Sequence, residues 1–314
     1  MKRGERHLAI IVGLLVLVII VTGGYFFARN PERETLDDAA RAHAPGKFVR
    51  LADGVTHYDI DGPDTGRTVV LVHGFSVPAY IWDSTATALA SAGYRVVRYD
   101  EYGRGWSDRP DVVYNADLYD RQLVQLLDSL HIHDRIDLGG VSMGGWVTAT
   151  FVGRHPERVR SLVLSDPVAG TSARPSEKFY WPIVGSFLWQ TTAVPGMAEG
   201  QLSDLVQPSR FPDWADRYRP QMRFRGFGRA LLSTRRETAG MNTDTLYARV
   251  ARTGVPVLLL WGTADKTVPF ARSSSVRRAI PSAEFHAIDG AAHLPILERA
   301  PVVDSLMLAF LART

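Results

Sequence analysis

The sequence predicts an α/β domain with an eight-stranded, mostly parallel sheet and helices on both faces, preceded by a transmembrane helix. From Lys47 onward, short runs rich in β-forming residues alternate with helix-like segments, which is the pattern of a parallel sheet with crossover helices. Before Lys47, one apolar run is about long enough to cross the hydrocarbon layer of a membrane as a helix. The length of 314 residues suits one large domain of this kind.

The expected elements follow from these runs in chain order. The expected strands cover residues 47–51, 55–60, 68–72, 94–99, 135–141, 161–165, 255–261 and 283–288. The expected helices cover residues 79–92, 116–130, 143–155, 270–280 and 301–311. The chain shows no internal repeat and no low-complexity tract, so a single domain accounts for residues 47–314.

Composition excludes several classes of protein. Hydrophobic residues make up 46% of the chain and charged residues 22%, as in ordinary globular proteins. The chain has no cysteine, which excludes a disulfide scaffold, a thiol nucleophile and thiolate metal sites. A net charge of +3 is small for this length, so nucleic-acid binding is not expected.

The apolar run covers residues 8–27 and contains no charged side chain. Lys2, Arg3 and Arg6 precede it, whereas acidic and basic residues are mixed after it, so the positive flank predicts a cytoplasmic N-terminus at residues 1–7. The domain at residues 47–314 is then expected on the extracytoplasmic side. Residues 28–46 are polar and are expected to form a stalk or linker.

A cleaved signal peptide is the alternative interpretation of this N-terminus, and it would make the protein secreted. The run is longer than the usual apolar region of a signal peptide, and its exit at residues 22–27 offers no clean A-x-A cleavage site. A buried core helix is disfavoured because the run has no polar face. We therefore expect an uncleaved signal-anchor helix at residues 8–27.

A G-x-S-x-G pattern lies between an expected strand and an expected helix, at Gly140-Val141-Ser142-Met143-Gly144. In such a turn the serine adopts a strained backbone conformation that exposes its hydroxyl, and the flanking glycines avoid collisions with neighbouring elements. Ser142 is therefore the candidate nucleophile.

Two loops that follow later strands supply the candidate partners of Ser142. Asp265 follows the seventh expected strand and His293 follows the eighth. Because the carboxyl ends of parallel strands lie on one edge of a sheet, the three side chains can converge as nucleophile, base and acid. Asp166, which follows the sixth strand, and Asp289, which is close to His293 in sequence, are rival candidates for the acid.

The loop His73-Gly74-Phe75 follows the third expected strand. The backbone N–H groups of Phe75 and Met143 are the candidate oxyanion hole, since Met143 follows the nucleophile and begins a helix. His73 is expected to organise the loop and not to transfer protons.

A glycine-containing loop at residues 100–110 follows the fourth expected strand. It lacks the third glycine and the lysine of a phosphate-binding loop, so we interpret it as a tight structural turn near the site, with Trp106 bordering the substrate pocket. No histidine motif of a metalloenzyme is present. Neither a metal nor an organic cofactor is expected.

Together these positions make residues 47–314 resemble the serine-dependent α/β-hydrolase superfamily. Five pieces of the chain carry the resemblance: residues 73–75, residues 100–110, residues 140–144, Asp265 and His293. Of these, residues 100–110 are similar to the motif D-x-x-G-x-G-x-S of the superfamily. The branch it is similar to contains esterases, monoacylglycerol lipases, carbon–carbon bond hydrolases and prolyl aminopeptidases. An N-terminal membrane helix is similar to that of membrane-anchored monoacylglycerol lipases. Haloalkane dehalogenases and epoxide hydrolases carry an aspartate where this chain has Ser142, which argues against both.

The resemblance also implies that residues of about 167–240 form a helical cap after the sixth strand. This interval is rich in aromatic residues, which would either line a pocket for apolar substrates or form the core of the cap. Its arginines could face anionic lipid headgroups, bind an acidic substrate or solvate a helical face; they are Arg210, Arg217, Arg219, Arg223, Arg225, Arg229, Arg235 and Arg236.

The sequence therefore predicts a membrane-anchored serine hydrolase that cleaves carboxylic esters of apolar or lipid-like substrates through an acyl-enzyme. The alternatives are a carbon–carbon bond hydrolase, an amidase or aminopeptidase, or a haloperoxidase-like enzyme on the same triad. A non-catalytic, membrane-tethered binding protein is a further alternative. The expected partners are a small-molecule or lipid ester and the membrane, and the sequence does not indicate an oligomeric state.

Overall fold

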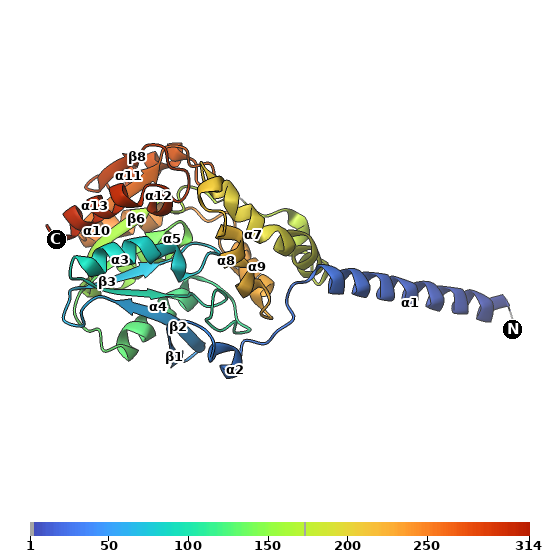
Figure 1. The fold of residues 1–314 in the computed structure, drawn as a ribbon. Helices are drawn as coiled ribbons and strands as arrows, with labels where there is room; N and C mark the ends of the chain where they lie inside the picture. The colour runs from blue at the N-terminus through green and yellow to red at the C-terminus, as the bar shows by residue number, and fades with distance from the viewer. Residues whose placement is uncertain (1–2, 173) are drawn as a thin grey trace.

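The computed structural model describes residues 3–172 and 174–314, and it contains an α/β domain from which one helix projects (Figure 1). That helix, α1, covers Arg3–Arg29 and is the element nearest the N-terminus. The rest of the chain forms a central sheet, helices on its two faces and a cap of short helices beside the end of α1.

The sheet has eight strands in the order β1-β2-β4-β3-β5-β6-β7-β8. The first two strands pair antiparallel, as do β2 and β4, and the remaining neighbours are parallel. This confirms the predicted eight-stranded, mostly parallel sheet. The strands are β1 (Lys47–Leu51), β2 (Gly54–Asp61), β3 (Thr68–Val72), β4 (Arg95–Tyr99), β5 (Ile136–Val141), β6 (Val159–Ser165), β7 (Val257–Gly262) and β8 (Glu284–Ile288).

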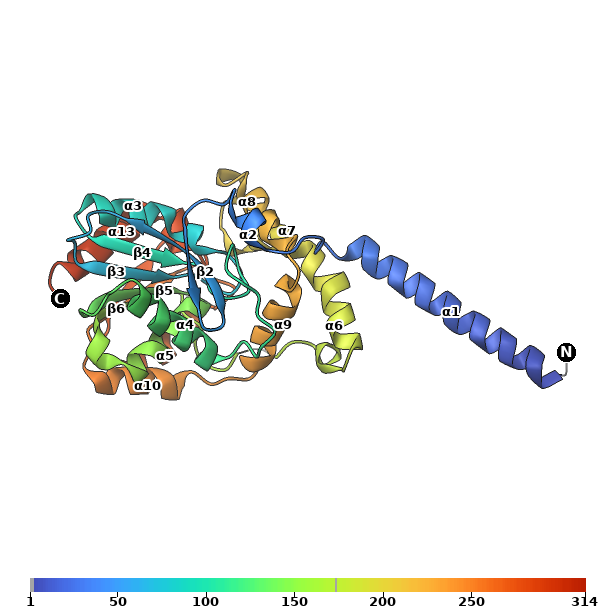
Figure 2. The ribbon, with the colours of Figure 1, turned by 90° about the horizontal axis from the view of Figure 1, so that it is seen from below.

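Helices cover both faces of the sheet (Figure 2). One face carries α3 (Asp83–Ser91) and α13 (Ala300–Leu311). The other face carries α4 (Ala116–Ser129), α5 (Met143–Arg154), α10 (Asp244–Thr253) and α11 (Ser273–Ala279). Every residue of β5 and β7 is buried between these layers, which is why both strands read as nearly continuous apolar runs.

Two helices of the sheet domain, α10 and α12 (Pro295–Glu298), were not among the expected elements. Helix α10 buries only Tyr247 and Val250 fully, so its apolar stripe is narrow. Helix α12 is a single turn that follows the loop of His293. Helix α12 is too short to show a repeated apolar spacing, whereas α10 does show one at Leu246, Tyr247, Val250 and Ala251, so the prediction overlooked it.

The cap lies between β6 and α10. Its main helices are α6 (Val184–Leu188), α7 (Met197–Gly200), α8 (Trp214–Met222) and α9 (Phe227–Glu237). Five of its aromatic side chains are buried against one another and against the sheet domain, whereas Tyr180 and Trp181 are exposed; the five are Trp189, Trp214, Tyr218, Phe224 and Phe227. These residues therefore form the core of the cap and do not line a substrate pocket.

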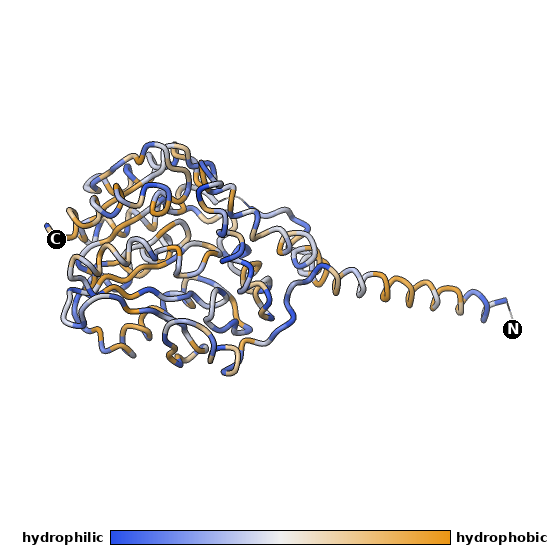
Figure 3. Tube along the Cα trace, viewed as in Figure 1, coloured by the Kyte–Doolittle hydropathy of each residue, from blue (hydrophilic) through white to orange (hydrophobic). Residues whose placement is uncertain are grey.

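Helix α1 has no buried residue, and its surface is apolar along most of its length (Figure 3). Its length and hydropathy are sufficient for it to cross a membrane. At its C-terminal end, the rings of Tyr25 and Phe26 lie 6.3 and 6.0 Å from the ring of Phe187 in α6. The end of the apolar helix is therefore in contact with the cap.

The segment that was expected to be a stalk lies against the cap. The carboxylate of Glu32 accepts hydrogen bonds from the N–H groups of Gly226 and Gly228, each at 2.7 Å. Glu34 forms a β-bridge with Phe224. A short helix, α2 (Asp38–Arg41), then leads into β1. The connection between α1 and the sheet is thus held in place by hydrogen bonds.

Candidate active site

The turn between β5 and α5 presents Ser142. Its backbone has φ 54° and ψ −117°, a region that non-glycine residues rarely adopt. A Cβ atom at Gly140 would collide with the carbonyl oxygen of Gly144, and one at Gly144 would collide with that of His73. Close approach of these backbones therefore requires glycine at both flanking positions, as the G-x-S-x-G pattern predicts.

Three loops at the carboxyl edge of the sheet bring the predicted triad residues together. Nδ1 of His293 lies 2.8 Å from Oδ2 of Asp265, and Nε2 of His293 lies 2.9 Å from Oγ of Ser142. An imidazole that donates from Nδ1 to the carboxylate leaves Nε2 free to accept the serine proton. The arrangement has the geometry of a nucleophile, a general base and an orienting acid.

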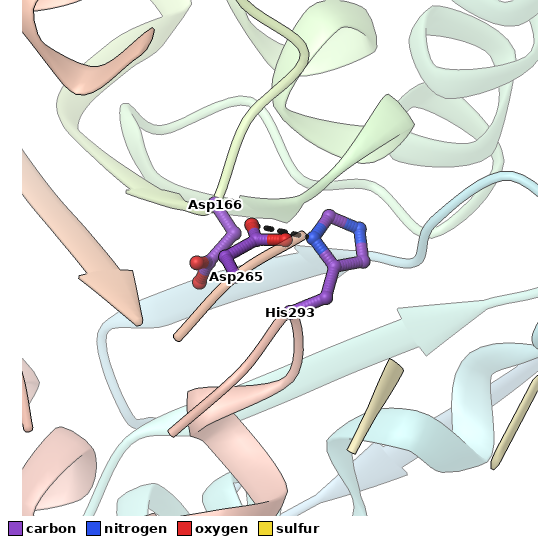
Figure 4. A group of neighbouring side chains, drawn as sticks. All are labelled: Asp166, Asp265 and His293. Atoms are coloured by element: carbon purple, nitrogen blue, oxygen red, sulfur yellow. Dashed lines mark hydrogen bonds and ion pairs between the residues drawn. The ribbon is translucent and has the colours of Figure 1, made fainter. Parts of the chain in front are cut away.

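Asp265 is the acid that contacts the imidazole (Figure 4). Its Oδ1 also accepts from the N–H groups of Thr267 and Val268, at 2.8 and 3.0 Å. Three hydrogen-bond donors therefore converge on this carboxylate and fix its orientation toward His293. Asp289 lies outside the group, because it is exposed and its carbonyl accepts from Arg299.

The rival acid Asp166 lies in the same cluster, directly beside Asp265 (Figure 4). Its Oδ1 accepts from the N–H of Gly262 at 2.8 Å, and its Oδ2 accepts from the hydroxyl of Ser165 at 3.0 Å. Burial, and then the charge of Asp265, raise the pKa of Asp166 well above its usual range. Asp166 therefore retains its proton more readily than an ordinary aspartate does.

The surroundings of His293 favour its imidazolium form. Burial lowers the pKa of His293, but the hydrogen bond and charge of Asp265 and the charge of Asp204 raise it, and the net pKa lies above 6.5. Asp204 belongs to the cap, and its carbonyl accepts the backbone N–H of His293 at 3.1 Å. Sequence reasoning missed Asp204, because nothing in the sequence around it places it near the base.

The candidate oxyanion donors lie on either side of Ser142. A Cβ atom at Gly74 would lie 3.3 Å from Cβ of Ser142, so the loop that carries Phe75 passes directly against the nucleophile. Met143 is the first residue of α5, where backbone N–H groups have no acceptor within the helix. Phe75 and Met143 both line the cavity above Ser142.

His73 holds the Phe75 loop and stays neutral. Its Nε2 accepts from the N–H of Glu101 at 2.9 Å, so its Nδ1 carries the proton and lies 2.7 Å from the carbonyl oxygen of Gly74. Burial lowers the pKa of His73 to about 4. These contacts agree with the expectation that His73 organises the loop.

Arg104, which sequence reasoning also missed, holds the backbone of Phe75 in position. Its guanidinium is fully buried and donates to the carbonyl oxygen of Phe75 at 2.8 Å and to the hydroxyl of Tyr119 at 2.6 Å. The available signal was its place between Gly103 and Gly105 in the turn at residues 100–110.

Trp106 does not line the cavity, contrary to expectation. Its ring lies 5.3 Å from that of Phe224 in the cap, and its backbone N–H donates to Asp100 at 2.8 Å. The second contact turns the loop so that the indole points toward the segment linking α8 and α9. The loop is therefore a structural turn, as predicted, but Trp106 packs against the cap.

A cavity of about 360 Å³ opens above Ser142. About half of its lining residues are apolar; they include Val77, Ile81, Val141, Trp146, Val168, Met241 and Leu294. The charged side chains besides His293 are Asp204, Arg235 and Arg272, and uncharged polar residues such as Ser76, Ser172, Gln201 and Thr238 also line it. A wall of this mixed kind suits a small ligand that has both an apolar part and polar groups.

The sheet, the cap and the serine turn define an α/β-hydrolase. The chain belongs to the family described as serine aminopeptidase, S33 (Hydrolase_4), whose profile matches residues 63–300. This confirms the superfamily that the sequence motifs indicated.

Similar proteins differ in the reactions for which they are named. A non-heme haloperoxidase of Mycobacterium phage D29 is 28% identical over 84% of this chain and 94% of its own length. A 2-hydroxy-6-oxononadienedioate/2-hydroxy-6-oxononatrienedioate hydrolase of Paraburkholderia phymatum is 29% identical over 86% and 96%, respectively. The crystal structure of a membrane phospholipase A, described as a bacterial virulence factor, superposes with a TM-score of 0.68 at 23% identity. That superposition covers 99% of this chain and 98% of the other.

Proposed function

We propose that the protein is a serine hydrolase that cleaves carboxylic esters of apolar or lipid-like substrates. The observation that carries the proposal is the chain of contacts from Ser142 Oγ through His293 to Asp265, at 2.9 and 2.8 Å. A serine hydroxyl is a weak nucleophile unless a base in contact with it removes its proton, and this contact supplies the base.

The proposed reaction uses each group at a defined step. His293 Nε2 takes the proton as Ser142 Oγ bonds to the ester carbonyl carbon, and the carbonyl oxygen becomes an oxyanion held by the N–H groups of Phe75 and Met143. The imidazolium then gives its proton to the departing alcohol, leaving an acyl-enzyme. Water, deprotonated by His293, attacks the acyl carbon and releases the acid and the free serine.

Cleavage of a carbon–carbon bond is the second candidate, and the names of the dienedioate hydrolases to which the chain is similar favour it. An alcohol needs one proton from His293 in order to leave, whereas a carbon leaving group must also be stabilised as a carbanion or protonated on carbon beforehand. Ester cleavage therefore makes the smaller demand on the residues present. The amidase and haloperoxidase alternatives share the same triad.

We further propose that α1 anchors the enzyme in a membrane, with residues 1–7 in the cytoplasm and the catalytic domain outside it. The uncharged apolar run and the basic residues before it support this orientation. Because Phe187 of the cap contacts Phe26, near the end of the apolar run, such an anchor would hold the cap close to the membrane surface.

The test is turnover of chromogenic esters of increasing acyl length by the purified full-length protein, beside its Ser142→Ala variant. We expect turnover that is lost in the variant and that is highest at one acyl length. That acyl length reports the size of the cavity. Absence of turnover on every ester would reject ester hydrolysis, and dienedioate and amide substrates would then be tested in the same pair of proteins.

A further inference from the structure

A cationic side chain without an acidic partner lines the active-site cavity. Arg235 lies in the last turn of α9, and its guanidinium carbon is 5.5 Å from the ring centroid of Phe75. Within residues 3–172 and 174–314, it forms no ion pair and no hydrogen bond. Its side chain is open to the cavity, and its donors are available to a ligand.

Other arginines of the cap have structural partners. Arg217 pairs with Asp83 at 2.6 Å and Arg229 pairs with Asp111 at 2.6 Å. Arg236, the neighbour of Arg235 in sequence, donates through Nε to the carbonyl oxygen of Phe179 at 3.0 Å. Arg235 thus differs from these three arginines, because within the described residues no ion pair or hydrogen bond ties its charge to the fold.

The environment of Arg235 makes an anionic ligand favourable. Burial lowers the pKa of Arg235, and the group that opposes this effect is the phenol of Tyr180, not a carboxylate. An arginine nevertheless remains protonated at neutral pH, and although much of the Arg235 side chain is exposed to solvent, its positive charge faces the cavity. A carboxylate or phosphate could accept two parallel hydrogen bonds from its planar guanidinium.

The cavity as a whole is biased toward anions. A second cation, Arg272, lines it, with Nη1 donating to the carbonyl oxygens of Ala169 and Thr171 at 2.9 and 3.1 Å. The acid of the lining, Asp204, is hydrogen bonded to Thr267 and lies beside His293. A substrate with a free ammonium group would therefore be repelled by the two guanidinium groups wherever it did not contact Asp204.

We propose that Arg235 is an anion-binding residue of the active site, and that the ester substrate carries a carboxylate or a phosphate on the part that occupies the cavity. The proposal rests on the proposed ester hydrolysis for the nature of the reacting bond. Because Arg235 lies over the ring of Phe75, whose N–H is the candidate oxyanion donor, the anionic group binds on the Phe75 side of the reacting carbonyl. Arg235 thereby selects the substrate without taking part in proton transfer.

Binding to the full-length Ser142→Ala protein tests this selection without any turnover. Calorimetry would compare monoethyl adipate with diethyl adipate, and 1-hexanoylglycerol 3-phosphate with 1-hexanoylglycerol, in dilute detergent. We expect at least one anionic member to bind about tenfold more tightly than its neutral partner, since a hydrogen bond to a charged group contributes that much. The pair that shows the preference distinguishes a carboxylate from a phosphate.

Three further substitutions assign the preference to Arg235. Arg235→Gln should abolish it, Arg235→Lys should keep part of it, and Arg229→Gln, on the same helix but paired with Asp111 outside the cavity, should leave it intact. Equal binding of the neutral and anionic members in both pairs, or a preference that survives Arg235→Gln, would overturn the proposal. Thermal unfolding of each variant checks that the fold is retained.

Turnover of the same compounds by the protein with Ser142 intact separates this proposal from ester hydrolysis itself. If both members of each pair are hydrolysed at equal kcat/KM, the enzyme is an esterase and the anion site is rejected. If no ester is hydrolysed but anions bind in an Arg235-dependent way, the anion site stands and ester hydrolysis is rejected.

Discussion

The carboxyl group of Asp166 lies against that of Asp265, the residue whose Oδ2 is 2.8 Å from Nδ1 of His293. Two adjacent buried carboxylates repel each other, so one of them retains its proton. Burial and the charge of Asp265 raise the pKa of Asp166, whereas three donors converge on Asp265. Both residues were candidates for the acid because each follows a strand. The hydrogen-bond donors around each carboxyl group distinguish their roles.

Asparagine substitutions at the two positions should therefore have unequal effects. Asp265→Asn should lower kcat about 10⁴-fold, because an amide no longer fixes the imidazole tautomer. Asp166→Asn replaces a carboxyl group whose pKa is raised by an uncharged amide of similar shape and should lower kcat by less than about tenfold. Steady-state kinetics of both purified variants measure the difference. A larger loss in Asp166→Asn than in Asp265→Asn would reverse the assignment.

The positive φ of Ser142 predicts a difference in stability between two inactive variants. Ser142→Ala and Ser142→Gly should each lower turnover about 10⁶-fold, as in other serine triads. Glycine adopts φ 54° without strain, so Ser142→Gly should be more stable to unfolding than Ser142→Ala by about 1 kcal/mol. Denaturant titrations of both variants in the same detergent measure this; equal stabilities would show that the turn stores no strain.

The pH dependence of turnover should report the raised pKa of His293. The base must be neutral to accept the serine proton, so the acidic limb of kcat/KM should have its midpoint above pH 6.5. Asp204→Asn removes a negative charge near the imidazolium and should move this midpoint to lower pH. Both statements are checked by measuring kcat/KM across the pH range with an ester that has no ionisable group in that range. Asp216→Asn, which changes an exposed acid of α8, serves as the control. An unmoved midpoint in Asp204→Asn would exclude its charge as a cause.

The buried histidine His57 predicts a pH-dependent contribution to stability. His57 lies 2.8 Å from Asp100 through Nδ1 and 2.9 Å from the carbonyl oxygen of Pro45 through Nε2. Burial lowers the pKa of His57, but the charge and hydrogen bond of Asp100 raise it, and the net pKa lies above 6.5. A raised folded-state pKa contributes stability that is present below pH 6.5 and is lost as the pH rises through that pKa.

The His57→Gln variant measures this contribution. The difference in Tm between the wild type and His57→Gln should be larger at pH 6 than at pH 9, because the charged pair is complete only at the lower pH. His286→Gln, at the partly exposed position beside Glu284, provides the comparison for a surface histidine. A difference in Tm that is constant between the two pH values would contradict an imidazolium at His57.

Removal of residues 1–29 should release the enzyme from membranes. Alkaline carbonate should leave the full-length protein in the membrane pellet, whereas the truncated protein should remain soluble and retain ester turnover. Asn30 and Glu32, which contact the cap, are kept in this truncation. Mature protein that begins after residue 27 would instead identify the helix as a cleaved signal peptide.

The sequence by itself determined the order of strands along the chain and the candidate residues of the catalytic triad. Strands at the centre of a parallel sheet are buried on both faces, so β3, β5 and β7 appear as apolar runs with clear ends. Ser142 directly follows β5, Asp265 lies in the loop after β7, and His293 lies in the loop after the edge strand β8; a parallel sheet places all these ends on one edge. Local pattern and topology therefore predicted this site without any knowledge of side-chain packing.

Only the tertiary structure decided which side chains complete the site. Asp204 and Arg235 reach the cavity from the cap, whose short helices carry little periodic signal, and Trp106 leaves the cavity because its backbone is bound to Asp100. Asp166 and Asp265 both follow strands, and their different roles depend on the donors that surround each carboxyl. These outcomes arise from contacts between residues far apart in the chain, so no local pattern contains them.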